Sequence, residues 1–229
     1  MNIKGLQKTT LLDFPEKLAC TVFTGGCNFR CPFCHNASLV LNTDSVESIS
    51  EEEFFKYISK RSGMLDGVCI TGGEPMLCSD LEAFIKKIRS YGLLIKLDTN
   101  GSFPEKLNHL LDEGLIDYVA MDIKNSVSKY AMTAGVKEFP QNIEKSIDII
   151  MQKAPDYEFR TTVVRELHSP QDIVEIAERI KGAKKYFLQS YVDSGDTIVS
   201  GFSAYSASEM LEILDIAKKI LPSTVLRGV

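Results

Sequence analysis

Short apolar runs rich in β-branched residues alternate six times along this chain with amphipathic segments. The apolar runs cover residues 18–24, 67–71, 93–98, 117–123, 158–164 and 185–191. The amphipathic segments cover residues 50–61, 80–91, 104–113, 142–153, 170–181 and 206–220, and several begin at Ser, Asp or Pro and end at Gly or Pro. Repeated strand–helix units of this kind predict parallel strands joined by helical crossovers.

The length of the chain limits how far such a sheet can close. A complete barrel of eight strand–helix units typically needs about 250 residues, and this chain has 229. We therefore predict an α/β fold, a partial (β/α)6 TIM-like barrel with parallel strands and outer helices. An open doubly wound sheet fits the same pattern. Because no linker or low-complexity segment interrupts the alternation, we expect a single domain over residues 1–229.

The charge balance excludes some classes of partner. The formal net charge is −5, so the chain as a whole has no bulk attraction for nucleic acid or for an anionic membrane. Residues 1–15 lack the apolar core of a targeting signal, and no run of 18 uncharged apolar residues occurs. We expect a cytoplasmic protein with reduced thiols and with neither a nucleic-acid nor a membrane partner.

Three cysteines, Cys27, Cys31 and Cys34, follow the first predicted strand with the spacing CxxxCxxC. Thiolates crowded on one short loop are typical ligands of iron–sulfur clusters or zinc. A structural zinc site usually takes four protein ligands, and His35 is poorly placed to be the fourth because it adjoins Cys34. Three ligands would instead leave one iron of a [4Fe–4S] cluster open. A zinc-stabilised binding module stays as the alternative.

Polar motifs also follow the second, third and fourth predicted strands. Because the carboxyl ends of parallel strands meet at one edge of the sheet, we expect these motifs to share a site with the cysteines. Glycines there would let the backbone approach a ligand closely. The residues concerned are Gly72, Gly73, Glu74, Asp98, Thr99, Asp122 and Lys124.

These motifs, in this order, resemble those of the radical S-adenosylmethionine (SAM) superfamily. The segments Asp98-Thr99-Asn100-Gly101 and Met121-Asp122-Ile123-Lys124 are similar to elements of the activases of glycyl radical enzymes. The resemblance implies that Cys27, Cys31 and Cys34 hold a [4Fe–4S] cluster and that SAM chelates its open iron.

The resemblance also implies roles for the residues around SAM. It assigns the amino group of SAM to Gly72, Gly73 and Glu74, and the SAM carboxylate to Lys124. In the remaining roles, Phe33 and His35 border the adenine, Arg160 on the fifth strand approaches SAM, and Asp98, Thr99 and Asp122 hold a monovalent cation, Na⁺ or K⁺.

The implied activity is reductive cleavage of SAM to methionine and a 5′-deoxyadenosyl radical, which removes a hydrogen atom from a glycine of a partner enzyme. The stretch FTGGCNFRCPFCHN is similar to activators of anaerobic (class III) ribonucleotide reductase. The implied partners are that glycyl radical enzyme and a one-electron donor such as flavodoxin or ferredoxin. A radical SAM enzyme acting on another glycyl radical enzyme, a small molecule or a peptide is the alternative.

Some positions depart from the pyruvate formate-lyase activase pattern. Its N-terminal glycines around an aspartate are replaced by Asp13-Phe14-Pro15-Glu16, and Gln189 or Tyr191 stands near the place of a histidine beside SAM. Cys20 and Cys69 lie in apolar strands and are predicted to be buried thiols, whereas Cys78 follows the glycine loop. Residues 39–49 and 126–139 are predicted surface loops that would recognise the partner.

Overall fold

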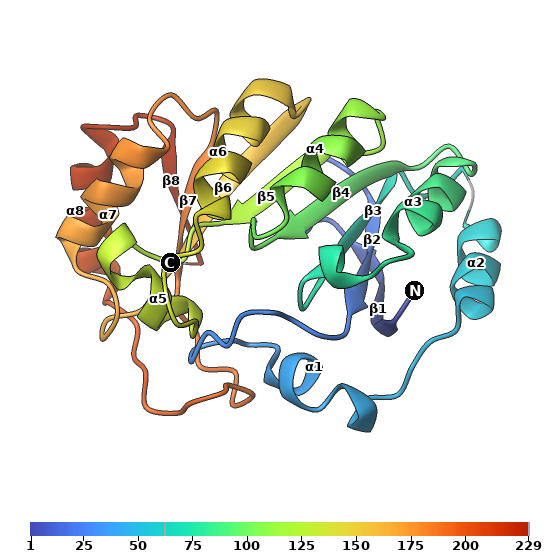
Figure 1. Ribbon diagram of the computed structural model, residues 1–229, viewed down its shortest axis with the longest axis horizontal. Coiled ribbons are helices and arrows are strands. Elements are labelled where there is room, and N and C mark those ends of the chain that lie inside the picture. Colours follow the sequence, from blue (N-terminus) through green and yellow to red (C-terminus); the bar gives the residue numbers. More distant parts are fainter. Residues whose placement is uncertain (62, 229) are drawn as a thin grey trace.

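The computed structural model describes residues 1–61 and 63–228 and contains one eight-stranded sheet in sequential order (Figure 1). Strand β1 runs antiparallel to β2, and every later neighbouring pair is parallel. Within the described residues, β1 and β8 do not pair with each other, so the sheet stays open. The strands are β1 (Ile3–Thr10), β2 (Ala19–Thr24), β3 (Gly67–Gly72), β4 (Leu94–Thr99), β5 (Tyr118–Asp122), β6 (Asp156–Val163), β7 (Tyr186–Ser190) and β8 (Thr224–Arg227).

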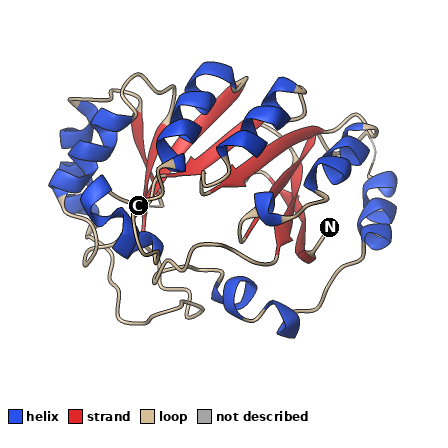
Figure 2. Ribbon diagram, in the orientation of Figure 1, coloured by secondary structure: helices blue, strands red, loops and turns tan. Residues whose placement is uncertain are grey.

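Most helices lie along one side of the curved sheet, whereas α1 and α5 lie on the other side with the loops that follow the strands (Figures 1 and 2). The α-helices are α1 (Ala37–Leu41), α2 (Glu51–Lys60), α3 (Leu81–Arg89), α4 (Pro104–Asp112), α5 (Val127–Ala134), α6 (Asn142–Lys153), α7 (Pro170–Arg179) and α8 (Ala207–Lys218). Two short 3₁₀ turns are η1 (Thr43–Ser45) and η2 (Pro75–Leu77).

The open α/β architecture with parallel strands and outer helices confirms the predicted fold class, but the strand count was wrong. All six predicted strands and helices are present, and β1 and β8 are two further strands. The β1 sequence IKGLQKTT is largely polar and half exposed, as suits an edge strand, so it gave no apolar signal. Strand β8 has only four residues, and its sequence TVLR does not alternate between apolar and polar side chains.

The two segments predicted to be surface loops also differ. Within residues 39–49, Leu39 and Val40 are buried in α1. Residues 127–134 form α5, which buries Tyr130 and ends at the left-handed Gly135. Each segment therefore contains a short packed helix, whereas residues 42–49 and 135–139 are largely irregular and partly exposed, and the role of both segments in recognising a partner stays a prediction.

Alternation along the strands separates an apolar outer face from a polar inner face of the sheet. On β4, Ile95 and Leu97 belong to the main core with the side chains of α3, such as Phe84 and Ile88. Lys96, although only 2% exposed, is not part of that core, and its ammonium group ion-pairs with Asp98 two positions along the same face. The fold therefore directs charged side chains into the concave side of the sheet.

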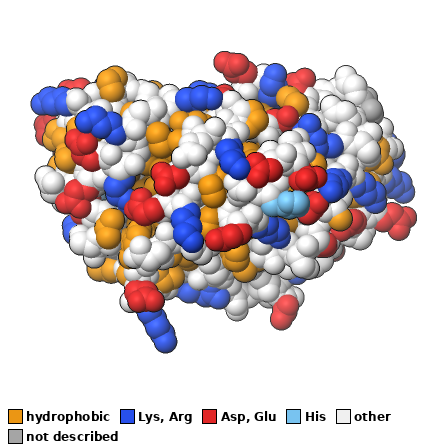
Figure 3. Space-filling view, turned by 45° about the horizontal axis from the view of Figure 1, so that its top comes forward, with side chains coloured by type: hydrophobic (Ala, Val, Ile, Leu, Met, Phe, Trp, Pro, Cys, Tyr) orange, Lys and Arg blue, Asp and Glu red, His pale blue; other side chains and the backbone are white. Residues whose placement is uncertain are grey.

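The outer surface carries no comparable grouping of charge on the face that Figure 3 shows, where acidic and basic side chains are interspersed. Among the described residues, no helix is both long enough and apolar enough to cross a membrane.

Candidate active site

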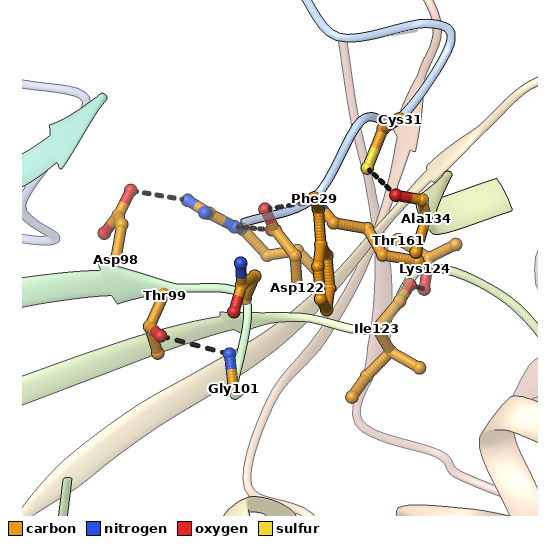
Figure 4. A network of polar contacts seen from close by, with 12 residues as sticks. Phe29, Cys31, Asp98, Thr99, Gly101, Asp122, Ile123, Lys124, Ala134 and Thr161 are labelled. Atoms are coloured by element: carbon orange, nitrogen blue, oxygen red, sulfur yellow. Dashed lines mark hydrogen bonds and ion pairs between the residues drawn. The ribbon is translucent and has the colours of Figure 1, made fainter. Parts of the chain in front are cut away.

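The cysteine loop leaves the end of β2 and is held by backbone hydrogen bonds from two sides. Gly26 N donates to Leu39 O of α1 at 2.8 Å, and Arg30 N donates to Ala134 O of α5 at 2.9 Å. A further bond from Cys34 N to Cys31 O, at 3.0 Å, closes the turn between two of the cysteines. The Cys31 thiol also lies 3.8 Å from Ala134 O (Figure 4). Helix α5 therefore anchors the loop that carries the thiols.

One cavity of about 470 Å³ gathers almost every residue that the sequence predicted for the site. It lies where the loops that follow the strands meet, as expected for a parallel sheet. The predicted residues that line it are Cys27, Cys31, Phe33, Cys34, His35, Gly72, Gly73, Asp98, Thr99, Asp122, Lys124 and Arg160. Further lining residues include Asp13, Phe29, Asn36, Thr71, Asn100, Thr162, Gln189 and Ser190.

Two thiols of the cysteine loop, those of Cys27 and Cys31, are poorly solvated. Burial raises the pKa of Cys27 and raises that of Cys31 to about 12, so both are protonated at neutral pH until a metal displaces the proton. Within the described chain, no three His, Cys, Asp or Glu side chains gather closely enough to hold a single metal ion.

Glu74 is the one predicted site residue that does not line the cavity. Its side chain is fully buried beneath the loops, where Oε1 accepts from Thr99 Oγ1 at 2.9 Å and Oε2 accepts from Asn100 N at 2.7 Å. Burial raises the pKa of Glu74 to about 7, although these hydrogen bonds oppose the shift. Glu74 thus ties the loop after β3 to the loop after β4.

Asp98 and Asp122 lie at the ends of neighbouring strands (Figure 4). Both carboxylates accept hydrogen bonds from the same guanidinium group, that of Arg160. Arg160 Nη1 lies 3.0 Å from Asp98 Oδ2, and Arg160 Nε lies 2.8 Å from Asp122 Oδ1. Lys124 Nζ lies 3.0 Å from Asp122 Oδ2. Burial would raise the pKa of Asp122, but the charges of Arg160 and Lys124 hold it below its usual range.

Lys96 is a further member of this network that we did not predict from the sequence, and it pairs with Asp98 on the side away from Arg160. Its ammonium group contacts Asp98 Oδ1 and lies 3.8 Å from Cys69 Sγ. A signal was present, because a lysine in the otherwise apolar run LIKLD shares a face with the aspartate two residues later.

The donors assigned to the predicted monovalent cation already have partners within the chain, and the cation itself stays a prediction. The carboxylates of Asp98 and Asp122 already pair with cationic side chains, and the hydroxyl of Thr99 donates to Glu74.

The two candidates for the place of the family histidine differ in position. Gln189 lines the cavity, whereas Tyr191 is buried with its ring 5.4 Å from that of His35. Burial lowers the pKa of His35, which keeps the imidazole neutral. Cys20 and Cys69 are buried, as predicted, and Cys78 is half-buried outside the cavity lining.

The profile of the radical SAM superfamily matches residues 21–180, and the chain belongs to that superfamily. A Methanocaldococcus jannaschii protein, provisionally named a glycyl-radical enzyme activating enzyme, is 31% identical to this chain. The alignment covers 99% of this chain and 96% of that protein. This chain is 30% identical, over 55% of its length, to a probable GTP 3′,8-cyclase of Halobacterium salinarum, of which it spans 37%.

Among solved structures, a domain of pyruvate-formate lyase-activating enzyme from Bacteroides vulgatus superposes with a TM-score of 0.56. The match covers 71% of this chain and 99% of that domain at 17% sequence identity, so it supports the fold alone. The chain is therefore a radical SAM enzyme. The Methanocaldococcus jannaschii homologue, provisionally named an activating enzyme, matches it over almost its whole length.

Gly135 offers a test of how α5 positions the cysteine loop. Its φ is +65°, and a Cβ there would lie 2.1 Å from Arg30 O. We predict that Gly135→Ala destabilises the metal-free protein by more than the roughly 1–2 kcal/mol of a left-handed alanine and lowers the iron bound per chain after anaerobic reconstitution. Urea unfolding and iron analysis measure the two effects.

Gly182 provides the matched control, because its φ of +89° is also left-handed but its nearest neighbour to a Cβ is Met151 Cε at 3.9 Å. Gly182→Ala should show only the backbone penalty and bind iron normally. Equal stability and equal iron content in the two variants would contradict the proposed anchoring.

The raised pKa of Glu74 predicts a pH dependence of stability. A carboxyl group whose pKa rises from 4.5 to about 7 on folding stabilises the protein below pH 4.5 and loses that contribution as the pH rises through 7. The loss corresponds to at most about 3 kcal/mol. Glu74→Gln cannot ionise and should lack this dependence, which urea unfolding of both metal-free proteins at pH 5 and pH 8 would reveal. Parallel pH profiles of the two proteins would contradict it.

Proposed function

We propose that this protein is an activating enzyme that uses SAM and a [4Fe–4S] cluster to remove a hydrogen atom from a glycine of a partner glycyl radical enzyme. The observation that carries the proposal is one cavity in which three thiols of one loop meet polar residues of five strands, β3 to β7. The full-length similarity to the Methanocaldococcus jannaschii protein supports the activating class over the cyclase, of which this chain spans only 37%.

The donor set fits an iron–sulfur cluster, with Cys27, Cys31 and Cys34 as the ligands. When bound, a reduced cluster supplies the single electron that breaks a sulfonium C–S bond of SAM, which yields methionine and a 5′-deoxyadenosyl radical. The chain itself binds and orients SAM and excludes water from the radical.

The residues that face the thiols across the cavity suit the methionine part of SAM. Lys124 and Arg160 present cationic donors for its carboxylate. Burial would lower the pKa of Lys124, but the charge of Asp122 outweighs burial and raises it, so Lys124 stays protonated. The backbone of Gly72 and Gly73 can approach the amino group closely. Phe33 and the neutral His35 offer flat, weakly polar surfaces for the adenine.

The partner we propose is an anaerobic (class III) ribonucleotide reductase, and the electron donor is a flavodoxin or a ferredoxin. The similarity of the cysteine segment to activators of that reductase supports the choice. Another glycyl radical enzyme, a small molecule or a peptide is the competing substrate class.

The proposal predicts two products from the anaerobically reconstituted protein. With dithionite and SAM it should form 5′-deoxyadenosine, and with the reductase added it should generate a glycyl radical doublet in the electron paramagnetic resonance spectrum. Replacing Cys27, Cys31 or Cys34 by Ala should lower 5′-deoxyadenosine formation by at least about 100-fold, equivalent to about 2.7 kcal/mol.

Cys78→Ala is the matched control, since Cys78 lies outside the cavity lining and should not alter the yield. Formation of 5′-deoxyadenosine without a glycyl doublet would transfer the proposal to another substrate. A zinc-containing protein that forms no 5′-deoxyadenosine would refute it.

A further inference from the structure

Five charged side chains form a continuous row on the inner face of the sheet, in the spatial order Lys96, Asp98, Arg160, Asp122 and Lys124. Each carboxylate lies between two cations, and the Arg160 guanidinium bridges the two carboxylates. We call these residues the charge row. They come from β4, from β5 and the residues just after it, and from β6, so the register of three neighbouring parallel strands sets their spacing.

All four carboxylate oxygens of the charge row already accept from cations. Lys96 Nζ pairs with Asp98 Oδ1, and Arg160 Nη1 pairs with Asp98 Oδ2. On Asp122, Oδ1 accepts from Arg160 Nε, and Oδ2 accepts from Lys124 Nζ. A Na⁺ or K⁺ ion binds through such hard oxygen ligands, and here it would have to share each of them with a protein cation and bear the repulsion of that charge.

Several other oxygens near the charge row already have hydrogen-bond partners. The Thr99 hydroxyl donates to Glu74 Oε1 and accepts from Gly101 N at 3.0 Å. Both carboxylate oxygens of Glu74 accept from the loop backbone or from Thr99. Asp13, which also lines the cavity, accepts from Thr21 Oγ1 at 2.5 Å.

Burial makes the Asp98 side of this pairing hard to rearrange, whereas the Asp122 side chain is 31% exposed. Lys96 is 2% exposed, Asp98 12% and Arg160 14%. A buried carboxylate that loses one partner becomes an uncompensated charge, which is strongly unfavourable. With three cations and two carboxylates, the row carries a formal charge of +1, so it has no surplus negative charge to attract a metal cation.

We propose that Lys96 and Arg160 supply from within the chain the positive charge that a Na⁺ or K⁺ ion would otherwise bring, so that this protein binds SAM independently of monovalent metal ions. Lys96 is a positioning residue. It pairs with Asp98 Oδ1, which leaves Asp98 Oδ2 facing Arg160 and so holds Arg160 in its bridging position beside SAM. The inference rests on the proposed function only in taking SAM as the ligand of the cavity.

The decisive measurement is SAM binding to the cluster-loaded protein, by anaerobic equilibrium dialysis with radiolabelled SAM. The buffers contain Na⁺, K⁺ or tetramethylammonium as the monovalent cation at equal ionic strength. The wild-type dissociation constant should stay within about twofold across the three buffers, because the charge row is complete without a metal ion. A tenfold or greater weakening in tetramethylammonium would overturn the inference.

Lys96→Met removes the charge but keeps a side chain of similar length, and it frees Asp98 Oδ1. In tetramethylammonium the variant should bind SAM at least tenfold more weakly than the wild type, and K⁺ or Na⁺ should restore most of the loss. Lys153→Met, which breaks an exposed ion pair with Asp112, is the matched control and should behave as the wild type.

The outcomes separate the two proposals. If Lys96→Met binds SAM normally without metal ions, or weakly whatever the ion, Lys96 does not substitute for a metal ion and the inference is overturned. If the variant does not fold, the wild-type comparison still decides. Failure of the wild type to bind SAM in any buffer would overturn the proposed function as well, whereas ion-dependent binding would overturn this inference alone.

Discussion

The concave side of the sheet is organised by charges that can be buried only together. Removing an isolated ammonium or carboxylate from water costs several kcal/mol, and the penalty is offset only when hydrogen-bonded partners of opposite charge are buried with it. The charge row meets this condition because the parallel registers of β4, β5 and β6 bring Asp98, Asp122 and Arg160 to adjacent positions. The site therefore depends on strand register before it depends on any loop.

The loops then build the rest of the cavity on this base. Glu74 joins the loops after β3 and β4, and Glu74 N donates to Gly26 O at 2.8 Å, which connects both to the start of the cysteine loop. On the far side, Ala134 at the end of α5 accepts from Arg30 N. The thiols thus lie on a loop fixed at both of its sides, which is the preorganisation that a cluster ligand set needs.

Much of this arrangement could be predicted from the sequence, because apolar runs that end in polar residues identify both the parallel strands and their functional ends. The two edge strands could not be predicted from the sequence, because the polar β1 and the four-residue β8 lack a periodic signal. The residue roles around SAM came from resemblance and stay predictions. The pairing of Lys96 with Asp98 required the three-dimensional register, and it changes the expected donor set of the cation site.

In the proposed active site, the three thiols bind iron and the charge row faces the methionine part of SAM. Anomalous diffraction above and below the iron edge, from crystals of the reconstituted protein with SAM, tests this arrangement most directly. We predict iron density within bonding distance of the sulfur atoms of Cys27, Cys31 and Cys34, with the SAM carboxylate beside Lys124 and Arg160. Zinc density at these thiols, or SAM bound away from the charge row, would contradict it.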